Sequence, residues 1–179
     1  MRTYSDEGIV LARRNFGEAD RILSIYSKNH GRVSTIAKGI RRTTSKKRGH
    51  LEVFSYIRFQ MAEGYGIGIL TEVETINSFE KIRKDLKRVS LAYFFTEVIG
   101  KITHERERND GIFELLLNYL EKLQFETSLR SFRFDFICEL LTITGFWPKE
   151  KVLLNPDEKL EEVIERGINS IRVGRKILI

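Results

Sequence analysis

The chain has 179 residues and a formal charge of +6 at pH 7, from 31 Lys and Arg against 25 Asp and Glu. Hydrophobic residues make up 41% of it, including 12 Phe, which supports a packed core and argues against global disorder. The lone cysteine, Cys138, excludes an intrachain disulfide, and the three histidines are too far apart to suggest a metal site. We therefore expect no metal and no cofactor.

No membrane contact is expected. The longest uninterrupted apolar run, residues 91–95, is far shorter than the roughly 18 residues that a membrane span requires. Asp6 and Glu7 interrupt the N-terminus before the apolar core of a signal peptide could form. We expect a cytoplasmic protein.

The first 77 residues have the alternating pattern and the turn residues of β-strands. Apolar side chains recur there at every second position, and glycines that can adopt positive φ separate the runs. The pattern predicts five strands joined mostly by short turns, over residues 8–13, 21–26, 33–40, 51–61 and 67–73.

From residue 79 onward the apolar spacing changes to three and four residues, which is typical of helices. Helices are predicted over 89–102, 112–123 and 129–144, with Asn109 and Ser128 as N-caps and Gly145 as the stop. Asn155 and Pro156 then predict a short helix that reaches residue 165. Residues 168–179 alternate loosely and can form a further strand.

Strands that precede helices favour the α+β class with separate domains. We expect an N-terminal five-stranded β-barrel over residues 1–78 and an α-helical domain over 79–150. Residues 151–179 form an unassigned tail.

Positive charge is concentrated in one segment between the third and fourth predicted strands. Between residues 28 and 50 there are eight Lys and Arg and no Asp or Glu, whereas the rest of the chain has 23 basic and 25 acidic residues. This segment predicts contact with a polyanion, and nucleic acid is the first candidate. The plain alternative is a solvated loop whose charge only aids solubility. The loop residues expected to neutralise phosphates are Lys38, Arg41, Arg42, Lys46, Lys47 and Arg48.

A five-stranded barrel with a basic loop is typical of OB-fold proteins that bind nucleic acid, in which aromatic rings stack on unpaired bases. Phe16 and Phe54 are expected mainly in the core, whereas three tyrosines are better candidates for stacking. The aromatic candidates are Phe16, Tyr26, Phe54, Tyr56 and Tyr65.

The search for catalytic residues finds no glycine-rich phosphate loop and no nucleophile beside a histidine partner. We therefore expect that the protein is not an enzyme. The alternative is a metal-dependent nuclease that holds Mg²⁺ with four acids close in sequence, Asp6, Glu7, Glu18 and Asp20. Acids that flank strands are more often solvated or paired with nearby arginines.

An ordered set of short motifs runs through both halves of the chain. In the strand region these are Glu7 to Leu11, Phe16 to Leu23, Gly31-Arg32, Ala37 to Arg42 with Ser45, Gly49 to Leu51 and Leu70 to Glu74. In the helical region they are Phe79, Glu97, Phe113 to Leu116 and Leu140-Leu141 through Gly145 to Pro148. No single motif is decisive, but together, in this order over residues 1 to about 150, they resemble the RecO family of bacterial DNA repair proteins.

The resemblance implies an OB-fold protein that acts as a recombination mediator and is not an enzyme. Proteins of this kind bind single- and double-stranded DNA, anneal complementary strands, and help load RecA with the partner RecR. They also bind the acidic C-terminal tail of single-strand DNA-binding protein. The family's DNA contacts lie largely on the basic barrel, to which we add Arg32 and Tyr56 as candidates.

The tail of single-strand DNA-binding protein is acidic and ends in an aromatic residue, so its receptor needs an apolar pocket with a basic rim. Arg130, Arg133 and Phe136 are the candidates for that pocket. The alternative is an ordinary solvated flank of a core helix.

The sequence departs from the family in two ways. Many members have a four-cysteine zinc site after the position of Pro148, but Lys149-Glu150-Lys151 follows here, so no zinc is predicted. About 30 residues follow Pro148, and we expect the rest of the helical domain to be reduced. Other functions that fit the same residues are a protein-interaction adaptor and an RNA-binding OB-fold protein.

Overall fold

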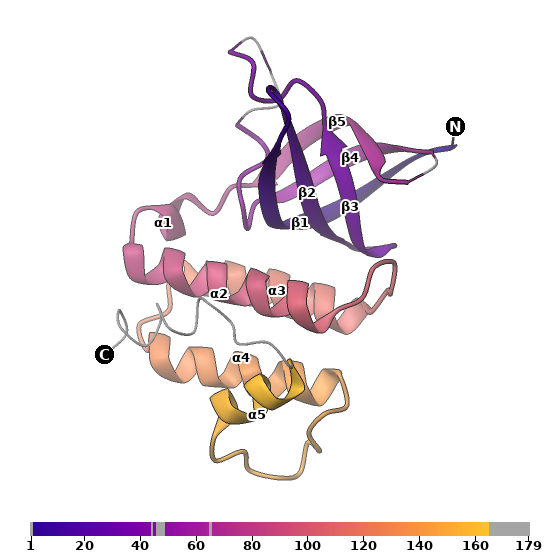
Figure 1. Ribbon diagram of the computed structural model, residues 1–179. Coiled ribbons are helices and arrows are strands. Elements are labelled where there is room, and N and C mark those ends of the chain that lie inside the picture. The colour runs from indigo at the N-terminus through magenta and orange to yellow at the C-terminus, as the bar shows by residue number, and fades with distance from the viewer. Residues whose placement is uncertain (1, 44, 46–48, 65, 165–179) are drawn as a thin grey trace.

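A computed structural model describes residues 2–43, 45, 49–64 and 66–164 of the chain. Five strands form a barrel, and helices are layered below it (Figure 1). The strands are β1 Arg2–Phe16, β2 Asp20–Ser27, β3 Gly31–Ala37, β4 Tyr56–Glu63 and β5 Gly68–Asn77. The helices are α1 Glu80–Arg83, α2 Leu86–Ile102, α3 Asp110–Leu123, α4 Leu129–Ile143 and α5 Pro156–Val163.

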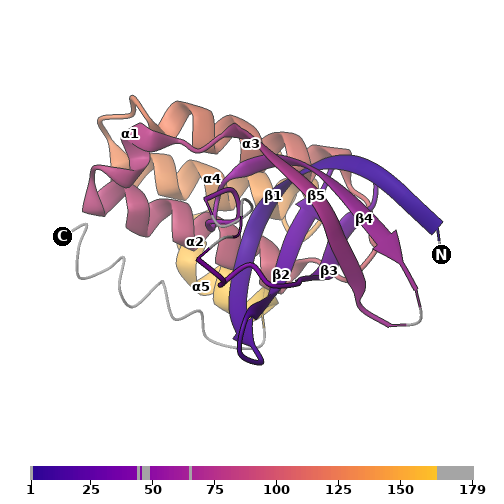
Figure 2. The ribbon, with the colours of Figure 1, turned by 90° about the horizontal axis from the view of Figure 1, so that it is seen from above.

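The barrel is closed in the strand order β1-β2-β3-β5-β4, as the view from above shows (Figure 2). All neighbouring strands are antiparallel except β3 and β5, which pair in parallel. Closure depends on the length of β1, whose first half pairs with β4 and whose second half pairs with β2. The predicted fold, a five-stranded OB-fold barrel followed by helices, is confirmed.

The centre of strand β1, Gly8 to Leu11, is buried on both faces. Val10 lies in the barrel interior with Leu23 and Phe59, whereas Ile9 and Leu11 belong to the cluster that contains the helices. Because neither face meets water, the strand is a continuous apolar run at its centre rather than an alternating one. The barrel and the helices therefore share one of the molecule's two hydrophobic clusters.

The strand predicted over residues 51–61 begins five residues later than expected. Residues 51–55 are irregular, with Phe54 at a φ of 57°. Leu51, Val53 and Phe54 are nevertheless buried, Leu51 inside the barrel and the other two against the helices. These side chains close the end of the barrel and pack against the helices. Their apolar spacing is the same as that of a strand, so the sequence pattern does not distinguish the two.

The helices begin and end close to the predicted residues. Asn109 caps α3 by accepting a hydrogen bond from the amide of Ile112, at 3.2 Å. Ser128 stands before α4, but its side chain makes no capping bond. Gly145, at a φ of 78°, follows the end of α4 as predicted, and α5 begins at Pro156.

Two predicted features of the tail have different outcomes. The short helix is present as α5, whereas the possible strand over 168–179 lies outside the described residues. Among the helices that the structure describes, none has the length and apolar character to cross a membrane.

The barrel meets the helical layers at the turn between β2 and β3. The Tyr26 hydroxyl donates a hydrogen bond to the carbonyl of Asn109, at 3.3 Å, and Arg106 N donates to the Arg32 carbonyl, at 2.8 Å. Gly31 has a φ of +66°, and a Cβ at that position would overlap the carbonyl oxygen of Glu107. Only glycine allows the backbones to approach so closely.

Asp6 fastens the start of β1 to the same turn. Its carboxylate accepts hydrogen bonds from Ser27 Oγ and from the amide of Asn29, at 3.0 Å for the latter, and contacts His30 Nδ1 at 2.8 Å. Burial alone would raise the pKa of Asp6, but these hydrogen bonds outweigh it and lower the pKa below its usual value. A lowered carboxyl pKa stabilises the fold at neutral pH.

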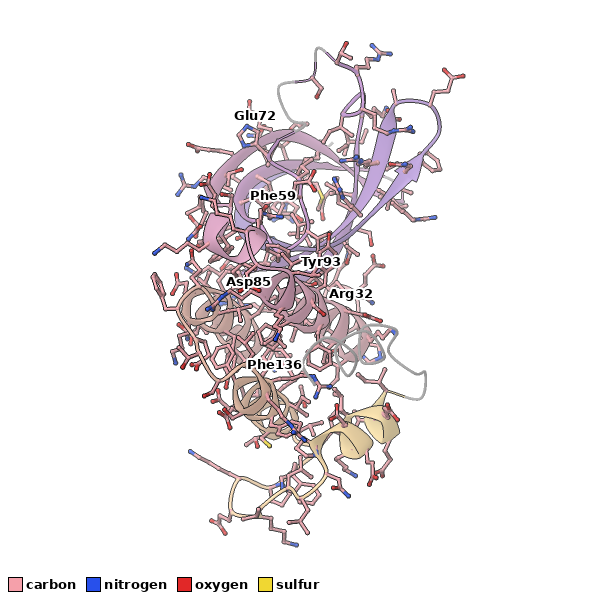
Figure 3. All side chains as sticks on the ribbon, turned by 90° about the vertical axis from the view of Figure 1, so that its left-hand side faces the viewer. Arg32, Phe59, Glu72, Asp85, Tyr93 and Phe136 are labelled. Atoms are coloured by element: carbon pink, nitrogen blue, oxygen red, sulfur yellow. The ribbon has the colours of Figure 1, made fainter. Side chains whose placement is uncertain are left out.

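We predict that Asp6→Asn lowers the free energy of unfolding at pH 7 by about 1–3 kcal/mol, because the amide cannot accept the same set of bonds. The contribution of Asp6 is present above about pH 4, the ordinary pKa of the free side chain, and is lost as the pH falls through the lowered folded pKa. Urea unfolding as a function of pH therefore gives a flatter acid limb for Asp6→Asn. Glu72→Gln, on the outside of the barrel (Figure 3), is the control and should match the wild type.

We also predict that Gly31→Ala destabilises the protein by more than about 2 kcal/mol, since the methyl group meets the 107 carbonyl. Gly17→Ala is the matched control, because Gly17 has a similar φ of +56° but no described atom within 4 Å of the added carbon. Chemical denaturation measures both. Equal losses would show that backbone conformation alone matters at Gly31.

Candidate nucleic-acid interface

The connection between β3 and β4 is held against the turn between β1 and β2. Gly39 N donates to Asp20 Oδ1 at 2.7 Å, and Arg41 N donates to the carbonyl of Ala19 at 2.9 Å. Ile40 is fully buried in the barrel interior and anchors the segment between them. The backbone of the basic segment is thus fixed at its start. It lies at the end of the barrel farthest from α4 and α5 (Figure 1).

Three predicted phosphate contacts project from this anchored backbone. Lys38, Arg41 and Arg42 are all exposed, and Arg41 Nη1 also donates to the carbonyl of Gly17, at 3.3 Å. Lys46, Lys47 and Arg48 lie outside the described residues. We define the loop patch as Arg14, Phe16, Lys38, Arg41 and Arg42.

Phe16 is the residue of the loop patch that sequence reasoning assigned mainly to the core. It is the last residue of β1, and its side chain is 48% exposed. Phe16 pairs with Asp20 across the β1–β2 hairpin, and Asp20 in turn accepts the hydrogen bond from Gly39 of the basic segment. The signal that could have revealed it is the glycine that follows, because an aromatic residue at the tip of a hairpin lies beyond the core.

The other aromatic candidates occupy different places. Tyr26 and Phe54 are buried between the barrel and the helices, and Tyr65 is outside the described residues. Tyr56 is half-buried, with its ring edge-to-face against Phe113. Its hydroxyl donates to Glu7 Oε2 at 2.7 Å, and burial, followed by this bond, raises the pKa of Tyr56 to about 12. The structure places Tyr56 at the barrel–helix junction and apart from the loop patch.

Arg32 also lies at that junction. It is half-buried on β3, its backbone forms an isolated parallel β-bridge with the backbone of Glu105, and its Nε atom is shielded from solvent. Its backbone lies at the opposite end of β3 from Lys38 of the loop patch.

The four acids considered for a metal site do not converge. Asp6 lies in the half of β1 that pairs with β4, and it contacts the β2–β3 turn. Asp20 is at the start of β2 and pairs with Phe16 at the other end of β1. Ten residues of strand separate these two points, roughly 30 Å. Within the described ranges, no three His, Cys, Asp or Glu side chains are grouped as metal ligands.

The three residues considered for a partner tail are separated by the fold. Phe136 is fully buried and stacks on Phe95, with ring centroids 4.1 Å apart, and Figure 3 shows it inside the helical layers. Arg133 is only 6% exposed and forms two hydrogen bonds with Asp157 of α5. These two residues join α4 to its neighbours, and only Arg130 of the three is exposed.

Arg130 borders a hollow of about 570 Å³ at the start of α4. Leu129 and Phe134 give the hollow an apolar part, and Lys87 from α2 adds a second cation. Phe125 precedes the first α4-side residue of the hollow, Thr127, by two positions and is 66% exposed. Lys81 Nζ lies 4.1 Å from the centroid of its ring. The combination of apolar and basic groups is therefore present, although on a different face of α4 from the one expected.

Two family profiles match consecutive parts of the chain. The one described as "Recombination protein O N terminal" matches residues 1–79, and "Recombination protein O C terminal" matches residues 83–152. The first covers the barrel and the second covers α2, α3 and α4.

Curated proteins named "DNA repair protein RecO" are similar over most of the chain. One from Dehalococcoides mccartyi is 34% identical over 157 residues, which is 88% of this chain and 62% of the relative. One from Pelotomaculum thermopropionicum is 36% identical over 123 residues, 69% of this chain and 48% of the relative. One from Alkaliphilus metalliredigens is 34% identical over 147 residues, 79% and 58% respectively. The chain thus spans about half to two thirds of the length of these relatives.

Proposed function

The chain belongs to the RecO family of DNA repair proteins, and from this we propose that it binds DNA, anneals complementary single strands and assists the loading of RecA during recombinational repair. Its proposed partners are single- and double-stranded DNA, the C-terminal tail of single-strand DNA-binding protein, and RecR. The family match supports all of these partners, and the surface of the molecule supports DNA and the tail.

The observation that carries DNA binding is the anchored basic segment. Its described cations, Lys38, Arg41 and Arg42, are presented on a backbone that is held at Gly39 and Arg41, at an end of the barrel that also carries the exposed ring of Phe16. Asp20, the acid nearest to Gly39, accepts a backbone hydrogen bond there. Fixed cations lose little conformational freedom when they meet a phosphate chain, and the ring can stack on an unpaired base.

Annealing follows from the same charge. When the loop cations neutralise phosphates, condensed counterions are released and the mutual repulsion of two strands is screened. Two complementary strands can then approach on one protein surface, and base pairing itself supplies the specificity. This mechanism requires no catalytic group.

The tail of single-strand DNA-binding protein is proposed to bind at the hollow beside α4. An acidic peptide with a terminal aromatic residue matches an apolar floor of Leu129 and Phe134 and a rim of Lys87 and Arg130. The N-terminal end of α4 also favours negative charge.

We predict that binding of a single-stranded oligonucleotide weakens steeply with salt. If about five phosphates are neutralised, log K falls against log salt with a slope of about −3 to −4. Reversing the charges of Arg41, Arg42, Lys46 and Lys47 together should weaken binding at least about 100-fold and flatten the slope. Fluorescence anisotropy at several salt concentrations measures both quantities.

The control is a charge-matched variant that reverses four exposed lysines away from the loop patch: Lys84, Lys122, Lys149 and Lys151. Equal weakening in both variants would mean that net charge alone matters and would refute the assignment to the loop. No binding of bare DNA by the wild type would favour an adaptor, and tighter binding of RNA of the same sequence would favour an RNA-binding protein.

A separate prediction concerns the hollow beside α4. The double variant Lys87→Glu, Arg130→Glu should bind a synthetic acidic peptide that ends in Phe at least about fivefold more weakly, because two charge-assisted contacts become repulsive. Its DNA affinity should change less than that of the loop variant. The double variant Lys122→Glu, Lys149→Glu is the control, and equal losses of peptide binding in the two would place the peptide elsewhere.

A further inference from the structure

A pocket of about 410 Å³ lies between α2 and the outer face of the barrel. The helix contributes one face of α2, and the barrel contributes β1, β2, β3 and the segment before β4. Tyr93 and Arg32 both line it, and Figure 3 shows them where the barrel meets the helices. Its volume falls within the range of about 300–1,000 Å³ that is typical of small-molecule sites.

Two buried polar atoms without hydrogen-bond partners belong to residues of this pocket. Over the described part of the chain, Ser24 Oγ and Arg32 Nε are the buried side-chain atoms that lack a partner, and both residues line the pocket. Buried polar groups are almost always paired, because an unpaired one is costly. Both atoms lie behind the pocket surface with almost no exposed area, so their coincidence marks the wall of this pocket as polar and favours a polar ligand over an apolar one.

The remaining lining has an aromatic side and a charged rim. Tyr93 is 42% exposed, with its ring held edge-to-face against Phe54 at 5.6 Å between centroids. Arg13 is paired with Glu52 at 2.5 Å, and Lys101 is paired with Glu97 at 3.0 Å. Three cations, counting Arg32, therefore border the pocket together with one acid from its own lining, Glu97.

We propose that this pocket takes one unpaired nucleotide of the strand bound at the loop patch. Strand β1 connects the two places, since Ala12 lines the pocket and Arg14 and Phe16 follow it at every second position on the same face of the strand, the last roughly 13 Å away. A base enters beside Tyr93, its polar edge meets Ser24 and Arg32, and the adjoining phosphate lies near Arg13 and Lys101. This inference rests on the proposed DNA binding and extends it to a site for single strands.

A nucleotide suits the pocket better than the acidic tail does. The exposed residues Arg14 and Phe16 of the loop patch follow Ala12 of the pocket on one face of β1, whereas the hollow beside α4 lies on another part of the molecule. A duplex cannot use the pocket, because its bases are stacked and paired. The pocket therefore predicts a preference for single strands that phosphate contacts alone do not give.

Gly100 offers a way to fill the pocket without removing any contact. It lies on α2, and a Cβ at that position would be 3.9 Å from Leu11 Cδ1, the nearest described atom outside its own helix. Gly100→Leu therefore directs a side chain into the pocket, whereas Gly100→Ala leaves it open. Both residues favour a helix more than glycine does.

The probes are oligo(dT), an abasic sugar-phosphate strand of the same length, and a DNA duplex. We expect Gly100→Leu to bind oligo(dT) at least about fivefold more weakly, with the affinities for the abasic strand and the duplex unchanged. Gly100→Ala should match the wild type with all three probes. Thermal unfolding checks that both variants are folded, and Tyr93→Ala with Tyr93→Phe as its control tests the same pocket independently.

Unchanged oligo(dT) affinity in Gly100→Leu would overturn the proposal, as would an equal loss with all three probes. Loss of acidic-peptide binding in Gly100→Leu, with DNA binding intact, would assign the pocket to a peptide and also overturn it. A wild-type protein that binds no oligo(dT) would refute the proposed function itself. Failure of the pocket and failure of DNA binding are thus distinguished by the wild type.

Discussion

The burial of the outer face of β1 and β2 against α2 is the interaction on which the rest of the structure depends. At this place Ile9, Leu11 and Tyr26 pack outside the barrel interior, in the same hydrophobic cluster as the residues of the helices. Because this side of the barrel is covered, nucleic acid can approach it only from the remaining surface. The loop patch lies at an end that the helices leave uncovered, and the nucleotide pocket lies where their cover is incomplete.

The fold also determines where the positive charge of the basic segment is placed. A basic segment on an unattached loop would be a diffuse polyanion attractor, but Ile40 and the contacts to Ala19 and Asp20 fix where its cations begin. Elsewhere on the barrel, the conspicuous acids are engaged in the fold: Asp6 holds a turn, and Glu7 accepts bonds from Tyr56 and Arg58. Beside the basic segment itself, Asp20 accepts the Gly39 amide, and the exposed Glu18 is the other acid of the β1–β2 turn.

Much of the fold could be predicted from the sequence, because the spacing of apolar residues differs between strands and helices. The helix cap at Asn109 and the stop at Gly145 are local and were predictable for that reason. Residues 51–55 were not, since buried irregular backbone gives the same pattern as a strand. The site was harder: burial of Arg133 against Asp157 and exposure of Phe16 depend on contacts between distant segments, which no local pattern contains.

The close approach at Gly31 has a mechanical consequence. With no room for even a methyl group between the β2–β3 turn and the backbone at Glu107, the barrel cannot rotate as a hinge over the helices without breaking this contact. This contact favours a fixed separation between the loop patch and the hollow beside α4. A strand held at one and a protein tail held at the other would be kept at a set spacing, so that the protein acts as a rigid spacer and the flexible nucleic acid makes the movements.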